Sequence, residues 1–230
     1  MTALITLSHG SRHPNARAGI QALTHAAAER LGVTGIDAHL EFIAPTLDEA
    51  ARELSEPAVV VPLLFTEAFH ATHDVPAHLE AASAHARLTL APGLGMGDEL
   101  AEVLAERVAL DAPVGTHIAL YPVGTSDAQQ TQGYEALAAN LGERSGRGVS
   151  VVAATRGGVP ALAELARERG DLHVLPLFVA DGLLLDKARE AIPRIETETG
   201  ARMSCSGPLT TDLAGIVAGR YTTALEVCHA

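Results

Sequence analysis

The chain has 230 residues, of which 47% are hydrophobic and 19% charged, a balance typical of a folded globular protein and unlike that of a disordered one. Its formal net charge of −12 argues against nucleic acid and anionic membranes as partners, so a polyanionic ligand would need local arginines. No basic segment precedes the first apolar residues, and the longest apolar run, near 57–65, is far shorter than the ~20 residues that span a bilayer. We therefore expect a cytoplasmic protein with no membrane partner.

The two cysteines, Cys205 and Cys228, do not indicate a disulfide framework in a chain of this length. We interpret them as buried or incidental thiols. Cys228 and His229 could ligate a metal, but two ligands at the end of a chain make a weak site.

Short apolar segments alternate with alanine-rich helical segments along the whole chain. The first half predicts strands at 3–7, 36–42, 58–65 and 87–90, with helices at 16–31, 47–54 and 98–110. The second half predicts strands at 117–121, 149–154, 172–179 and 201–204, with helices that begin near 127, 160, 185 and 211. This alternation is typical of α/β proteins with parallel sheets.

The second half repeats the first at a constant spacing. Five pairs of identical residues lie 114 positions apart: Gly10 and Gly124, Pro62 and Pro176, Leu63 and Leu177, Gly93 and Gly207, and Asp98 and Asp212. Pro45 and Pro160 match with a slip of one residue, which a loop would tolerate. The spacing indicates a duplicated domain. We predict domains at 1–112 and 113–230, with the boundary near 113–116.

The two halves differ in their histidines. Eight of the eleven histidines lie in the first half, and the positions 114 residues after His9 and His70 hold Val123 and Leu184. The loss of both histidines from the second copy suggests that they serve a function rather than the packing of the repeat.

His9 and His70 each follow a predicted buried strand. His9 lies in the stretch HGSRHP after the first strand, and His70 follows the apolar run that ends at Phe65. Ligands of open α/β sheets bind at the carboxyl ends of strands, so the two histidines are expected to converge. His73 and Asp74 would share a helix face with His70. Imidazoles with a nearby carboxylate suit a divalent first-row metal.

A single histidine is more often a surface or structural residue than a ligand. We interpret His25, His39, His78 and His85 in that way. His117 and His173 come at the starts of strands, and therefore at the opposite edge of a parallel sheet.

Two stretches resemble the signatures of one known family. HGSR after the first strand, and PLLFTEAFHATHDVP from Pro62 to Pro76, are similar to those of the class II chelatases, the sirohydrochlorin cobaltochelatase and ferrochelatase family. LEFIAPT and APGLGMGDEL also fit. The first half resembles the family well, and the second half resembles it as a degenerate copy.

The resemblance implies two chelatase-like domains, each a four-stranded parallel sheet flanked by helices, that face each other across a cleft. It implies insertion of Fe²⁺, Co²⁺ or Ni²⁺ into sirohydrochlorin or a related tetrapyrrole without ATP and without a prosthetic group, for sirohaem or cobalamin biosynthesis. Short members of the family form dimers, so the duplicated chain is expected to be a monomer.

The resemblance also suggests roles for single residues. His9 and His70 are the candidate catalytic residues and metal ligands, with Glu67 and His73 as auxiliary ligands or a proton relay. Neutral histidine can both hold the metal weakly and accept the pyrrole protons. The expected substrate-binding residues are Ser11, Arg12, Ala44, Phe65, Thr66, Glu67, Ala68, Phe69 and Arg156. The arginines would offset the negative charge of the protein near a polycarboxylate substrate.

Two positions depart from the family pattern. Ala68 stands where a glycine is usual, and Ala44 stands where an acidic residue often precedes the proline. Both could change loop geometry or substrate contacts, and His73 could tune the metal preference.

Three other functions are considered. A histidine phosphatase would have an arginine before the motif histidine, where this chain has Ser8. A nucleophile-elbow hydrolase would need G-x-S-x-G, which the chain lacks. A non-catalytic metal or tetrapyrrole carrier on the same fold would keep the same histidines, and the sequence leaves it open.

Overall fold

The computed structural model describes residues 2–66 and 75–229, which form two compact α/β units. The first unit contains Met1–Gly95 and Thr210–Ala230, and the second contains Met96–Leu209. Each unit is built on one four-stranded sheet in which all strand pairs are parallel, as the sequence predicts.

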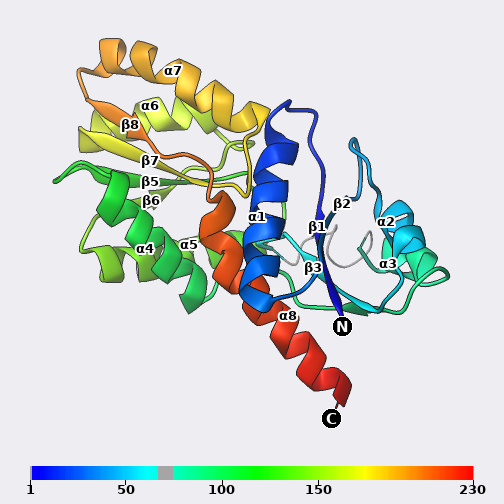
Figure 1. Ribbon diagram of the computed structural model, residues 1–230. Helices are drawn as coiled ribbons and strands as arrows, with labels where there is room; N and C mark the ends of the chain where they lie inside the picture. The colour runs from blue at the N-terminus through cyan, green and yellow to red at the C-terminus, as the bar shows by residue number, and fades with distance from the viewer. Residues whose placement is uncertain (1, 67–74, 230) are drawn as a thin grey trace. The chain divides into compact units, whose positions relative to one another are not determined.

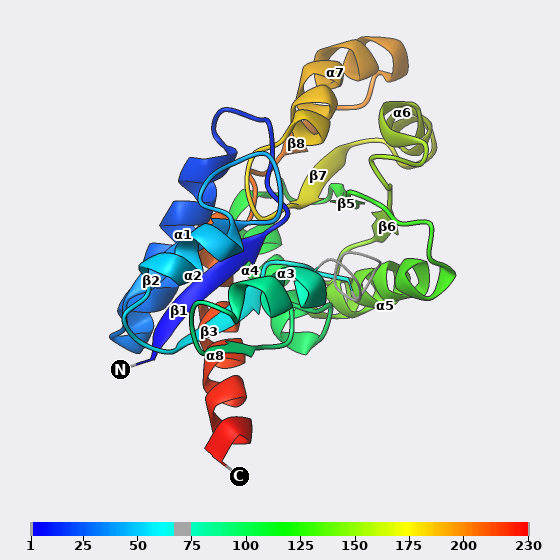
Figure 2. The same cartoon turned by 90° about the vertical axis from the view of Figure 1, so that its right-hand side faces the viewer.

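The sheet of the first unit has the strand order β2-β1-β3-β4. Its strands are β1 (Ala3–Ser8), β2 (Gly35–His39), β3 (Ala58–Pro62) and β4 (Leu88–Leu90). Its helices are α1 (Ala16–Leu31), α2 (Leu47–Glu53), α3 (Val75–Ala82) and, after the 3₁₀ turn Thr210–Leu213, α8 (Ala214–His229). Figures 1 and 2 show α1 and α8 on one face of this sheet and α2 and α3 on the other.

The second unit has the equivalent order β6-β5-β7-β8. Its strands are β5 (His117–Pro122), β6 (Val149–Val151), β7 (Leu172–Leu177) and β8 (Met203–Cys205). Helix α4 (Asp98–Asp111) packs with α5 (Ala128–Ser145), and α6 (Gly158–Arg169) packs with α7 (Leu183–Thr199), as Figure 1 shows.

Each sheet has its own hydrophobic core. In the first unit, Ile5, Leu7 and Val60 from the sheet are buried with Leu47 and Ala51 of α2. In the second unit, side chains of β5 and β7 are buried among those of α6 and α7. Because the central strands are covered on both faces, they are mostly apolar, which is why runs such as ALITL could be recognised in the sequence.

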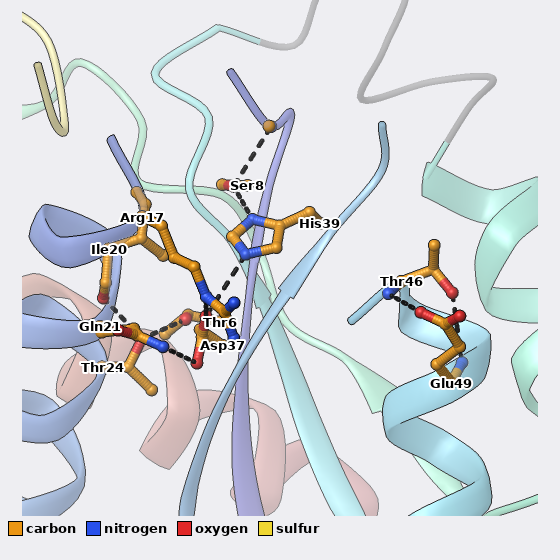
Figure 3. Close-up of polar contacts among 11 residues, drawn as sticks. Thr6, Ser8, Arg17, Ile20, Gln21, Thr24, Asp37, His39, Thr46 and Glu49 are labelled. Atoms are coloured by element: carbon orange, nitrogen blue, oxygen red, sulfur yellow. Dashed lines mark hydrogen bonds and ion pairs between the residues drawn. The ribbon is translucent and has the colours of Figure 1, made fainter. Parts of the chain in front are cut away.

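Local sequence signals explain where the helices begin and end. Helix α1 ends at Gly32, whose φ of 66° is the left-handed conformation that glycine adopts without steric cost. Helix α2 begins with a capping box: the Thr46 amide donates to the Glu49 carboxylate over 2.8 Å, and the Glu49 amide donates to Thr46 Oγ1 over 3.3 Å (Figure 3).

The duplication is visible in the hydrogen-bond register. Leu4 pairs with Gly35 in the first sheet, and Ile118 pairs with Val149 in the second. Each residue of the second pair lies 114 positions after its counterpart in the first pair. The pairs Ala3 with Ala58 and His117 with Leu172 keep the same offset. The repeat predicted from the sequence is therefore also a repeat of strand order and register.

The offset changes to 115 before the last strand of the second sheet. Ala58 pairs with Leu88, whereas Leu172 pairs with Met203. The matches of Gly93 with Gly207 and of Asp98 with Asp212 are therefore one residue out of register, and those expectations were wrong. Pro45 precedes α2, whereas Pro160 lies inside α6, so this pair does not occupy equivalent positions either.

The observed units also differ from the predicted boundary at 112 and 113. Helix α4 follows the first four strands in sequence but packs with α5 of the second unit, and α8 follows the last four strands but packs with α1. Each half of the sequence thus gives its last helix to the other unit, which a boundary placed at one point of the chain cannot describe.

Several strands are shorter than predicted. Strand β2 ends at His39 rather than at Phe42, whose φ of 68° is incompatible with extended backbone. Strand β3 ends at Pro62, before the apolar residues that extend to Phe65. Among residues 2–66 and 75–229, no helix is long and apolar enough to cross a membrane.

Candidate functional site

The turn that carries His9 leaves the carboxyl end of β1 in the middle of the first sheet. Leu7 pairs with Pro62 of β3, and the Leu63 amide donates to the Leu7 carbonyl over 2.8 Å. The chain therefore leaves β1 and β3 at neighbouring points of one sheet edge, as expected for a ligand site of a parallel α/β sheet.

The backbone around His9 is held by the segment that follows β2. The Leu40 amide donates to the Ser8 carbonyl over 2.9 Å, and the Glu41 amide donates to the His9 carbonyl over 3.0 Å. Gly10 has a φ of 91°, and a Cβ added there would collide with the Glu41 carbonyl. Only glycine therefore fits after His9.

Ser8 and side chains of the HGSRHP stretch that follows it fold the same turn. Ser8 Oγ accepts from the Gly10 amide over 3.2 Å, and Ser11 Oγ accepts from the His13 amide over 3.1 Å. His13 Nδ1 then accepts from the Asn15 amide over 3.2 Å, just before α1 begins. Three successive side-chain-to-backbone bonds thus replace regular secondary structure between β1 and α1.

His9 is half-buried and lies beside an aromatic ring. The rings of His9 and Phe42 meet edge to face, with centroids 6.0 Å apart. The Arg12 guanidinium lies 4.7 Å from the Phe42 ring centre, a cation–π contact. Phe42 is 52% exposed. The structure therefore brings two predicted site residues, His9 and Arg12, together through a residue that the sequence analysis did not select.

The other expected substrate-binding residues that the structure describes lie at four places. Ser11 belongs to the His9 turn, and Ala44 is exposed in the loop between β2 and α2. Phe65 and Thr66 follow β3 and line a cavity of about 400 Å³ with Arg220 of α8. Arg156 is exposed in the second unit, after β6.

Five predicted site residues lie outside the described residues: Glu67, Ala68, Phe69, His70 and His73. The expected convergence of His70 on His9 and the expected ligand set therefore stay predictions. Within 2–66 and 75–229, no three histidine, cysteine or acidic side chains lie close enough together to hold a metal ion.

A buried polar network behind His9 was missed by the sequence analysis. Ser8 Oγ and His39 Nδ1 are 2.7 Å apart, and His39 Nε2 lies 3.3 Å from Asp37 Oδ2 (Figure 3). On the far side, Arg17 Nε lies 3.7 Å from Asp37 Oδ2, and the Gln21 amide donates to Asp37 Oδ1 over 3.4 Å. The available signal was the IDAH segment, in which Asp37 and His39 share one face of β2.

His39 is fully buried, and burial lowers its pKa, although the neighbouring Asp37 carboxylate acts in the opposite direction. The imidazole is therefore neutral near pH 7. A structural role for His39, as the sequence analysis assigned it, agrees with the zero exposure of this side chain.

Comparisons with known proteins agree with the resemblance. The family model CbiX matches residues 3–110. A sirohydrochlorin cobaltochelatase of Sulfurisphaera tokodaii is 36% identical over 73 residues, which are 30% of this chain and 60% of that protein. A sirohydrochlorin cobaltochelatase of Sulfolobus acidocaldarius is 35% identical over 72 residues, 30% of this chain and 58% of that protein. The matches thus span somewhat more than half of these relatives.

Solved structures share the fold over the whole chain. SirB from Bacillus subtilis, solved with Fe³⁺, has a TM-score of 0.79 at 19% identity and covers 100% of this chain and 98% of its own. CbiX, described as the terminal enzyme of sirohaem biosynthesis in denitrifying bacteria, has a TM-score of 0.70 at 19% identity. The match covers 97% of this chain and 99% of that protein. The resemblance to the class II chelatases is thereby confirmed: residues 3–110 match the CbiX family model, and the solved structures of SirB and CbiX share the fold of the chain.

Proposed function

We propose that this protein is a chelatase that inserts a divalent metal ion into sirohydrochlorin or a related tetrapyrrole, without ATP. The observation that carries the proposal is the placement of His9 at the carboxyl end of β1, on a turn held by Glu41, within the segment that matches the CbiX family. The curated relatives named above are sirohydrochlorin cobaltochelatases, which supports the substrate class.

Metal insertion makes two chemical demands on the protein. The metal must lose water, and two pyrrole N–H protons must leave the ring. An imidazole can serve both as a weak metal ligand and as a proton acceptor, because the reference pKa of histidine, about 6.5, lies near physiological pH. We propose these roles for His9 and His70, with Glu67 and His73 as auxiliary ligands.

The substrate carries carboxylates, whereas the protein has a net charge of −12. We propose that Arg12 provides local positive charge, because its guanidinium is exposed beside the ring of Phe42 next to His9. Phe42 presents an apolar face of the kind that a flat macrocycle can contact. Arg156 is proposed for the same electrostatic role, and Phe65 and Thr66 as substrate contacts near the cavity after β3.

The test is anaerobic turnover of sirohydrochlorin with Fe²⁺, Co²⁺ or Ni²⁺, followed in the visible spectrum against a reaction without protein. Wild-type protein should show saturable conversion, and His9→Ala and His70→Ala should each lose it. His25→Ala is the matched control, since His25 is an exposed histidine on α1, and it should keep wild-type turnover.

The same experiment decides between the remaining alternatives. The metal with the highest kcat/KM identifies the preferred ion and hence a place in sirohaem or cobalamin biosynthesis. Stoichiometric binding of metal or tetrapyrrole without rate enhancement would instead identify a carrier and refute the enzymatic proposal.

A further inference from the structure

The network behind His9 has a defined direction. His39 Nε2 lies 3.3 Å from Asp37 Oδ2 without a hydrogen bond between the two atoms, and the negative charge of the carboxylate favours the tautomer that carries the ring proton on Nε2. In a neutral imidazole, Nδ1 is then a bare acceptor, and it must receive the hydroxyl hydrogen of Ser8. The lone pairs of Ser8 Oγ remain free to accept from the Gly10 amide. The hydrogen bonds therefore run from the Gly10 amide through Ser8 to His39, whose Nε2 faces the Asp37 carboxylate.

These hydrogen bonds hold in place the residues on both sides of His9. Ser8 is 7% exposed and His39 is fully buried, so neither is placed to attack or bind a substrate. Their bonds instead hold Ser8 and Gly10, while the Glu41 amide holds the His9 carbonyl. Because a metal ligand works best when its backbone and ring direction are settled before the metal arrives, such a frame favours catalysis.

The second unit shows that the fold does not need this network. The equivalent turn is present there: the Thr155 amide donates to the Val123 carbonyl over 3.0 Å, and Gly124 has a φ of 99°. At the positions equivalent to Ser8, Asp37 and His39, however, the chain has Pro122, Val151 and Ala153. The backbone turn therefore forms without a serine, a histidine or a carboxylate, and the network accompanies only the copy that carries His9.

We propose that His39 is a positioning residue for the His9 site, acting through Ser8, with Asp37 selecting its tautomer. The inference rests on the proposed function, since it concerns the presentation of His9 to the incoming metal.

The kinetic test compares Ser8→Ala, His39→Ala and His39→Gln. Loss of a residue that holds a metal ligand in place typically costs about 10- to 100-fold in metal affinity or activity. Ser8→Ala and His39→Ala should therefore lower kcat/KM for the metal by about that factor and leave KM for the tetrapyrrole unchanged. Glutamine can accept from Ser8 and donate to Asp37, so His39→Gln should recover most of the loss.

The matched control is His173→Gln. His173 is also buried and bonded to two serines, Ser204 at 2.8 Å and Ser206 at 2.9 Å, but it lies in the other unit. This variant should keep wild-type kcat/KM for the metal. An equal loss in the control would mean that the effects report stability only, and wild-type kcat/KM in Ser8→Ala and His39→Ala would refute the proposal.

Two measurements need no turnover and separate this inference from the proposed function. ¹⁵N NMR of the metal-free wild type should show His39 protonated at Nε2 and bare at Nδ1, and the opposite tautomer would refute the network. Co²⁺ titration by visible absorption should show affinity about 10-fold weaker in Ser8→Ala than in the wild type. If these hold and no metal is inserted, only the enzymatic proposal fails; equal Co²⁺ affinity in both proteins would refute the positioning role.

Discussion

The carbonyl oxygen of Glu41 occupies the space that a side chain on Gly10 would need. Glu41 also donates its amide to the His9 carbonyl, so one residue of the β2–α2 loop contacts the His9 turn twice. The backbone conformation at His9 is therefore decided by the segment after β2, where Glu41 lies 32 residues later in the chain.

Gly10→Ala should destabilise the protein by about 3–5 kcal/mol, because the positive φ is strained for alanine and the Glu41 backbone must move. Gly32→Ala is the matched control: its φ is 66°, but nothing lies within 4 Å of the added Cβ, so the cost should be about 1–2 kcal/mol. Urea unfolding of both variants measures the difference. Equal losses would show that Glu41 does not restrict Gly10.

Arg220 joins α8 to the loop after β4. Its Nε donates to the Gly93 carbonyl over 3.0 Å, and its terminal nitrogen donates to the Leu94 carbonyl over 2.9 Å. Arg220→Met should lower the free energy of unfolding by about 2–4 kcal/mol, because two partly buried carbonyls lose a charged donor. Arg194→Met, at an exposed ion pair with Glu198, should change it by less than about 0.5 kcal/mol. A similar effect of both variants in thermal or urea unfolding would contradict this role.

His173 should make stability fall in mild acid. Burial lowers its pKa in the folded state below 6.5, with Asp111 acting in the opposite direction and Arg147 and Arg107 adding to the lowering. Below pH 6.5 the histidine is therefore protonated in the unfolded chain but still neutral in the folded protein, so the free energy of unfolding decreases as the pH falls. Above pH 6.5 it is neutral in both states and contributes no pH dependence.

The measurement is urea unfolding of wild type and His173→Gln at pH 7.5 and pH 5.5. The wild type should lose more stability between the two values, by up to about 1.4 kcal/mol for this one group. Burial also lowers the pKa of His39 and of His117, so the variant should keep a reduced dependence. An unchanged dependence in the variant would exclude His173 as a source.

The duplicated chain should behave as a monomer. Two sheets of the same strand order are present in one polypeptide, so a second copy is not needed to supply the second unit. Sedimentation velocity across a hundredfold range of protein concentration should give one species of about 23.8 kDa. A dimer that persists at the lowest concentration would contradict the expectation.

The sequence by itself determined the α/β class, the duplication and the position of His9 at a strand end. Buried parallel strands are apolar along their whole length, so their number and order in the chain can be recognised from local composition. The offset of 114 likewise follows from residue numbers alone, and it reappears in the pairs Leu4 with Gly35 and Ile118 with Val149.

The tertiary structure alone decided which surfaces meet. An amphipathic pattern shows that a helix buries one face, but not against what, so the packing of α8 on α1 and of α4 on α5 was missed. The link from Ser8 through His39 to Asp37 depends on the register of β1 with β2, which sets Ser8 opposite His39. Ser8 and His39 are 31 residues apart in the sequence, and only this register brings their side chains within hydrogen-bond distance. Hydrogen bonding depends on the distance and angle between two groups, which their spacing in the sequence does not specify.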